Sequence, residues 1–146
     1  MGEKLNITPL LKAYKSFITA LDYAEEIESE NTEFRYYTEE MVKSAVIQHF
    51  EYTYELTWKM MKKFLKVDIG DRADTLSRPE LFRIIGEKQL ITDFSAWNKY
   101  NKARNKTSYT YNEDIAEEVY NTAKNFKNDL KEFITALKER TNIVTY

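Results

Sequence analysis

Apolar residues recur along most of this chain at the three- and four-residue spacing of amphipathic helices. The first such stretch begins at Thr8-Pro9, where the threonine caps the helix and a proline at its first position loses no hydrogen bond. It ends in the polar run 28–32. A second and longer stretch opens at residues 38–40, with acids near the positive helix end, and stops at Gly70. Its apolar stripe consists of Val42, Val46, His49, Phe50, Thr53, Leu56, Thr57, Met60 and Phe64.

Three further helices are predicted in the second half of the chain. Ser77 and Glu80 have the spacing of a capping box, and the short helix that they open ends near Gly86. The next helix follows a cap at Thr92 or Asp93 and covers residues 94–104. Asn112 caps the last helix, whose apolar stripe continues to Leu137.

These elements predict an all-α fold: an up-down antiparallel four-helix bundle with one extra short helix. No segment alternates at period two for long enough to form a sheet. The scarcity of turn residues, with three Gly and two Pro, favours long helices as well. We expect residues 1–146 to form a single domain, with a frayed tail over about 141–146.

The composition excludes several classes of site. There are no cysteines and only one histidine, so disulfides, a Cys nucleophile and a His/Cys zinc site are not expected, and no metal ligands are assigned. No phosphate-binding glycine motif is present. Residues 1–10 lack the apolar core of a signal peptide, and no apolar run is long enough to span a membrane. We therefore expect a cytoplasmic protein without a membrane partner.

The charge distribution directs attention to one segment. The chain has a net charge of −2, yet residues 94–112 contain no acid and four basic residues. Within this run, Arg104 offers a planar fork that matches phosphate oxygens, and Thr107, Ser108 and Thr110 add hydroxyl donors. Basic and aromatic side chains together indicate a phosphate or nucleotide contact. The competing interpretation is a solvated helix end with one-sided charge.

Two other groups have a structural interpretation beside a functional one. His49 falls on the apolar stripe of the long helix, which favours a buried or half-buried imidazole bonded to a neighbour over a catalytic one. On the same helix, polar side chains at four-residue spacing are typical of a solvated flank with ion pairs. They also fit a groove or a dimer face, formed by Glu51, Glu55, Trp58 and Lys59.

Two segments of the chain resemble a known family. Residues 48–59, Gln-His-Phe-Glu-Tyr-Thr-Tyr-Glu-Leu-Thr-Trp-Lys, resemble the second-helix signature of nucleotidyltransferase substrate-binding proteins. Residues 103–111, Ala-Arg-Asn-Lys-Thr-Ser-Tyr-Thr-Tyr, are similar to that family's Arg-Asn-x-x-Ser-His-x-Tyr segment. These proteins are small four-helix bundles of the HEPN type. The resemblance implies a homodimer and a minimal nucleotidyltransferase partner, which would use a nucleoside triphosphate and a divalent metal, whereas this chain would bind no cofactor alone.

The resemblance also assigns roles to residues. Arg104, Asn105, Ser108 and Tyr109 would bind a nucleotide or phosphate, and Tyr111 matches the tyrosine that the transferase of related toxins modifies. In those toxins an Arg and a His form an RNA-cleaving pair. Here Tyr109 stands at the position of that His, which replaces a group that titrates near neutral pH with a phenol.

The first function hypothesis is therefore a substrate-binding subunit that is not an enzyme by itself. It would hold a nucleotide or acceptor for the partner transferase. The alternative is a HEPN-type ribonuclease toxin that acts on RNA, with Arg104 and Tyr109 as its catalytic candidates, and that is neutralised by nucleotidylation on Tyr111. A helical scaffold whose basic segment is only surface is the third interpretation.

Overall fold

The computed structural model describes residues 4–29 and 35–146, which are almost entirely helical. These described residues form five α-helices: α1 (Thr8–Ser29), α2 (Arg35–Ile69), α3 (Arg78–Glu87), α4 (Phe94–Asn105) and α5 (Glu113–Lys138). Two 3₁₀ turns, η1 (Gly70–Thr75) and η2 (Thr107–Tyr109), follow α2 and α4, and two short strands, β1 (Leu5–Asn6) and β2 (Val144–Thr145), flank the helices. The predicted all-α class is confirmed.

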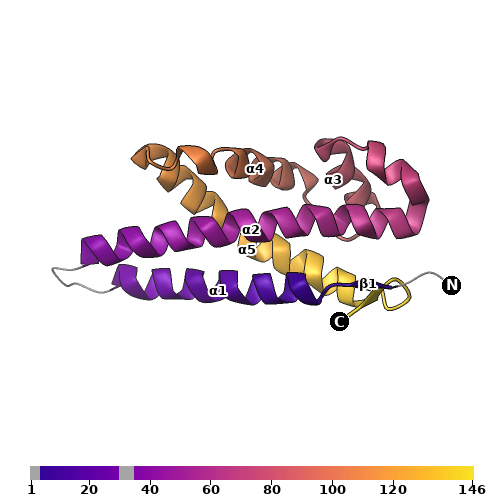
Figure 1. The fold of residues 1–146 in the computed structure, drawn as a ribbon, viewed down its shortest axis with the longest axis horizontal. Coiled ribbons are helices and arrows are strands. Elements are labelled where there is room, and N and C mark those ends of the chain that lie inside the picture. The colour runs from indigo at the N-terminus through magenta and orange to yellow at the C-terminus, as the bar shows by residue number, and fades with distance from the viewer. Residues whose placement is uncertain (1–3, 30–34) are drawn as a thin grey trace.

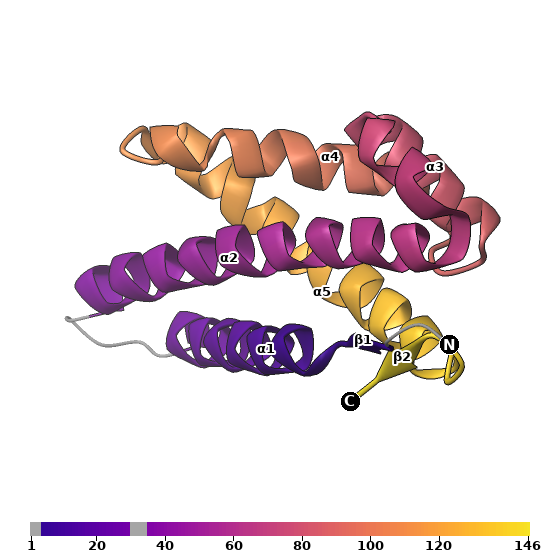
Figure 2. The ribbon, with the colours of Figure 1, turned by 45° about the vertical axis from the view of Figure 1, so that its right-hand side comes forward.

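The four long helices run alternately in opposite directions (Figure 1). α2 lies in the middle, with α1 along one side and α4 along the other, and α5 crosses α2 obliquely. The short α3 turns the chain from the end of α2 back to the start of α4 (Figure 2). The arrangement is the predicted up-down bundle with one extra helix.

Most helix ends lie where the capping residues place them. Ser77 accepts a hydrogen bond from the backbone N–H of Glu80, and the Glu80 side chain accepts one from Ser77, so the capping box is complete. Asp93 caps α4, and Asn112 caps α5. α2 begins at Arg35, earlier than the predicted opening at 38–40. α1 ends at Ser29, and residues 30–32 of the polar run lie outside the described residues.

The end of the chain differs from the predicted frayed tail over 141–146. β2 pairs in parallel with β1, and Ile7 N–H donates to the Thr145 carbonyl at 3.0 Å. Val144, a residue of β2, is buried. Two residues per strand are too few for a period-two pattern, so the sequence carried no signal, but the hydrogen bonds tie the end of the chain to the start of α1.

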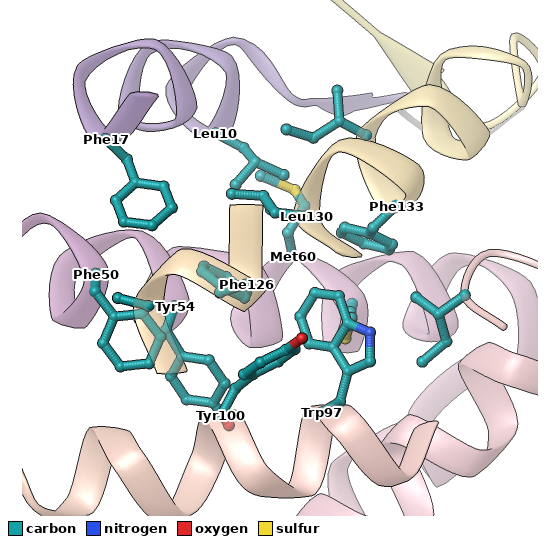
Figure 3. Packing of buried hydrophobic residues seen from close by; sticks show 14 of the residues in the cluster. Leu10, Phe17, Phe50, Tyr54, Met60, Trp97, Tyr100, Phe126, Leu130 and Phe133 are labelled. Atoms are coloured by element: carbon teal, nitrogen blue, oxygen red, sulfur yellow. The ribbon is translucent and has the colours of Figure 1, made fainter. Parts of the chain in front are cut away.

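The ring of Phe126, on α5, lies at the centre of the core (Figure 3). It is fully buried, and rings from α1, α2 and α4 surround it with centroid separations from 5.1 to 6.3 Å. Those rings belong to Phe17, Phe50, Tyr54, Trp97 and Tyr100. The ring of Phe17 is tilted against Phe126 and the other four are edge-to-face. Such pairs add to the free energy gained from burial, so one side chain joins all four long helices.

None of the described helices is long and apolar enough to cross a membrane.

We predict that Phe126→Ala lowers the free energy of unfolding by about 3–5 kcal/mol, because it removes a buried ring and leaves a cavity among four helices. Urea unfolding monitored by circular dichroism measures the change. Phe94→Ala is the matched control, since Phe94 is exposed on α4, and should cost roughly 0.5 kcal/mol or less. Similar losses in the two variants would contradict the central place of Phe126.

Candidate functional site

The segment with the predicted phosphate-binding residues forms the tight connection between α4 and α5. Its threonine hydroxyls stabilise the turn: Thr107 donates to the Arg104 carbonyl at 2.8 Å, and Thr110 donates to the Thr107 carbonyl at 3.1 Å. Thr107 is also buried. Of the three hydroxyls proposed as ligand donors, Ser108 alone is exposed and without a hydrogen bond to any described residue. The prediction for the two threonines is therefore wrong, because the turn itself uses them.

Arg104 lies against two carboxylates of α2. Its Nε donates to Glu55 Oε1 at 2.8 Å, and its Nη2 is 3.5 Å from Glu51 Oε1. The guanidinium is half-buried, with 27% of the side chain exposed. Because Glu51 and Glu55 are four residues apart on one helix, they approach the same edge of the guanidinium.

These ion pairs determine how Arg104 can meet an anion. Two carboxylates and one guanidinium sum to a charge of −1, so a phosphate would have to compete with carboxylates already in place. Nη1 of Arg104 has no polar partner among the described residues. Arg104 is therefore fixed in orientation through one edge and retains donors for a ligand at the other.

The Arg104 pair continues into a polar network that joins α2, α3 and α4. Trp58 Nε1 donates to the second oxygen of Glu55 at 3.1 Å. The guanidinium of Arg78, from the start of α3, stacks 3.5 Å from the centroid of the Trp58 ring. Arg78 also reaches Asn101 Oδ1 on α4 at 3.4 Å, one helical turn before Arg104. The chain of contacts thus starts and ends on α4.

Tyr54 connects this network to the core. Its ring packs against Phe50 and Phe126, and its hydroxyl donates to Asn101 Oδ1 at 2.6 Å. Burial raises the pKa of Tyr54 to about 12, so the phenol stays protonated and remains a donor at neutral pH. The side of α4 that carries Asn101 and Arg104 is therefore held in place from inside the protein.

The sequence singled out three members of this network as a groove or a dimer face: Glu51, Glu55 and Trp58. Lys59, the fourth residue of that set, is exposed, with its Nζ 5.9 Å from the Trp58 ring. Arg78 and Asn101 were missed. Asn101 lies three residues before Arg104 on the same helix face, and this spacing could have identified it from the sequence. Arg78 could not be identified in this way, because only tertiary packing brings it to Trp58.

Tyr109 and Tyr111 are both exposed and lie next to each other, with ring centroids 6.5 Å apart. Tyr111 is 84% exposed and lines a shallow groove of about 440 Å³ between α2 and the start of α5. Among the described residues, no hydrogen bond or cation–π contact joins either phenol to Arg104. The phenols therefore form a surface pair at the turn, beside the Arg104 network and not within it. Asn105, the last residue of α4, is exposed as well.

His49 is half-buried, as predicted, and lines a hollow between α1 and α2. The expected hydrogen bond to a neighbour is missing, since no described residue bonds to the imidazole. Asp22 and Glu26 line the same hollow, but no described acid is hydrogen-bonded to the imidazole as a partner for proton transfer would be.

Over the described ranges 4–29 and 35–146, no three His, Asp or Glu side chains gather closely enough to hold a metal ion.

Comparisons with known proteins agree on one family. A family model described as "Nucleotidyltransferase substrate binding protein like" matches residues 5–139. A Haemophilus influenzae protein named "Probable ribonuclease HepT" is 33% identical over 99 residues, which cover 66% of this chain and 68% of that protein.

A solved Haemophilus influenzae structure is also similar. It is described as revealing the fold of a substrate binding domain of a nucleotidyltransferase. It superposes with a TM-score of 0.81 at 26% identity, and the match covers 91% of this chain and 99% of that one.

The ion pairs of Arg104 with Glu55 and with Glu51 should differ in coupling energy. We predict a coupling energy of about 1 kcal/mol between Glu55 and Arg104, because that pair is close and only partly exposed. The coupling between Glu51 and Arg104 should be smaller, since the distance is longer and Glu51 is more exposed. Double-mutant cycles with Glu55→Gln, Glu51→Gln and Arg104→Ala, followed by urea unfolding, measure both couplings. Equal couplings would contradict the geometry.

Proposed function

This chain belongs to the family of nucleotidyltransferase substrate-binding proteins, and from that membership we propose that it is the substrate-binding subunit of a two-component nucleotidyltransferase. In this proposal it works as a homodimer and holds a nucleotide or an acceptor at Arg104 and the adjoining turn. The observation that carries the proposal is the family match over nearly the whole chain, including both segments that bear the candidate residues.

The geometry at Arg104 supports a binding role. Its guanidinium is anchored through one edge by Glu55 and Glu51, so ligand binding does not cost the conformational entropy of ordering a free side chain. Ser108 and Tyr109 are exposed on the turn just beyond it and supply hydroxyl donors for an anionic group.

The partner subunit would carry the chemistry in this division of labour. Transfer of a nucleotidyl group needs a nucleoside triphosphate and divalent metal ions held by carboxylates. Tyr109 stands at the position of the family's motif His and has a phenol where that His has an imidazole. A phenol is a much weaker base than an imidazole, so binding is better supported than catalysis.

A second candidate is a HEPN-type ribonuclease toxin. It is favoured by the relative named as a probable ribonuclease. Against it, this chain has Tyr109 where the Arg and His pair of such toxins has its His. In this case the transferase would silence the chain by nucleotidylation of Tyr111. The phenol oxygen would attack the α-phosphorus of a nucleoside triphosphate and release pyrophosphate, and the phenolic proton would pass to solvent.

Arg104→Ala should weaken the binding of a nucleoside triphosphate roughly tenfold to a hundredfold, because a charged hydrogen-bond donor is lost. Isothermal titration calorimetry measures the affinity, and light scattering checks for the homodimer. Arg83→Ala on the exposed side of α3 is the matched control for charge and should bind as the parent does. If Arg104→Ala keeps both its fold and its affinity, Arg104 is not the binding residue.

Co-expression with the cognate transferase should add the mass of a nucleotide to Tyr111, the most exposed large aromatic residue among the described residues. Peptide mass spectrometry locates the modification, and Tyr111→Phe should abolish it without affecting the fold. An unmodified Tyr111 peptide in the presence of active transferase would remove the toxin candidate's mode of silencing.

A further inference from the structure

A groove lined with lysines lies on the C-terminal half of α2, on the same helix as the carboxylates that hold Arg104. It encloses about 330 Å³ and begins at Trp58. Four lysines and one aspartate line it, which gives a formal charge of +3 on a protein whose net charge is −2. These charged residues, which we call the lysine groove, are Lys59, Lys62, Lys63, Lys66 and Asp74.

The lysines of this groove are not equally engaged. Lys62 and Lys66 lie 3.7 and 3.0 Å from the carboxylate oxygens of Asp74. Lys59 and Lys63 are exposed and form no ion pair with any described residue. Two positive charges are therefore unneutralised, while the paired ones hold the adjacent turn η1 in place.

The spacing of the lysines fits an extended anion better than a compact one. They lie at positions i, i+3, i+4 and i+7, on one face of α2. Lys59 and Lys66 are thus about 10 Å apart along the helix axis, from a rise of about 1.5 Å per residue. A single phosphate would reach only part of this row, whereas a chain of phosphates can follow it.

The aromatic end of the groove is rigid. Arg78 stacks on the Trp58 ring, and Glu55 accepts the hydrogen bond of the indole N–H. Positive side chains in a row with an aromatic residue at one end are typical of surfaces that follow the backbone of a single strand. An interface with an acidic protein would be expected to present more apolar and aromatic area than one half-buried tryptophan.

We propose that the lysine groove binds the phosphodiester backbone of a single-stranded nucleic acid without regard to its sequence. The groove is distinct from the turn that carries Ser108, Tyr109 and Tyr111, and Glu55 and Trp58 connect it to Arg104. The inference deepens the proposed function, because it names the acceptor as a nucleic acid, and that role as an acceptor rests on the proposed function. Binding of a nucleic acid to the groove can be tested without it.

The test compares two variants that lose the same charge. Lys59→Ala/Lys63→Ala removes the unpaired lysines, and Lys12→Ala/Lys15→Ala removes two exposed lysines of α1. Fluorescence anisotropy with labelled oligouridylate and oligodeoxythymidylate measures affinity at several salt concentrations. The parent should bind both, because lysines contact phosphates and not sugars. The groove variant should bind more weakly, with a salt slope shallower by roughly 1.4, about 0.7 for each lost phosphate contact.

The control variant should keep the slope of the parent, and Lys59→Arg/Lys63→Arg should keep both slope and affinity, since the charge is retained. Thermal unfolding checks that every variant folds. The proposal fails if the parent binds neither oligonucleotide, which is the result expected if the groove docks an acidic protein instead. It also fails if the two alanine variants lose affinity equally.

Arg104→Ala separates this inference from the proposed function. If Arg104→Ala loses nucleotide binding while the groove variant binds oligonucleotides as the parent does, the proposal for the lysine groove is wrong and the proposed function at Arg104 stands. The reverse pattern would overturn the function at Arg104 and keep the groove.

Discussion

The packing of four helices around the ring of Phe126 is the constraint on which the site depends. α5 crosses the bundle obliquely, and its Phe126 contacts rings of α2 and α4 at once. Close packing allows little sliding of one helix past another, so the position of α4 along α2 is fixed. Arg104 reaches Glu55 and Glu51 because this register places the end of α4 beside the middle of α2.

The boundary between core and surface passes through one residue. Tyr54 places its ring among the core aromatics and its hydroxyl on Asn101, in the polar network that ends at Arg104. A buried hydroxyl without a partner would be costly, so the hydrogen bond and the ring packing require the same register of α2 and α4. Packing in the core and orientation of the guanidinium are therefore parts of one arrangement. A change in core packing would therefore alter the orientation of the Arg104 guanidinium through Tyr54.

The elements of the fold could be predicted from the sequence because each has a local cause. Periodicity located the helices, and the caps at Ser77 and Asn112 located two of their starts. What could not be predicted has a tertiary cause. The pairing of β2 with β1 joins the two ends of the sequence, and the stacking of Arg78 on Trp58 depends on how α3 docks.

The same distinction holds for the candidate site. From the sequence, Arg104 and the two carboxylates were assigned to different surfaces. Their ion pairs follow only from the packing of α4 on α2. The threonine hydroxyls were assigned to a ligand because residue type alone does not reveal that a tight turn will use them.

The electrostatics of the two candidate surfaces are complementary. At Arg104 the two carboxylates exceed the single guanidinium, so this surface provides orientation and little attraction over distance. The lysine groove is positive and exposed, and attraction of this kind acts over about 10 Å at ordinary ionic strength. The lysine groove would therefore attract an anion over a distance, whereas the donors of Arg104 would act only in direct contact. Because Glu55 and Trp58 link the two surfaces through direct hydrogen bonding, the orientation of Arg104 and the shape of the groove's aromatic end depend on the same contacts.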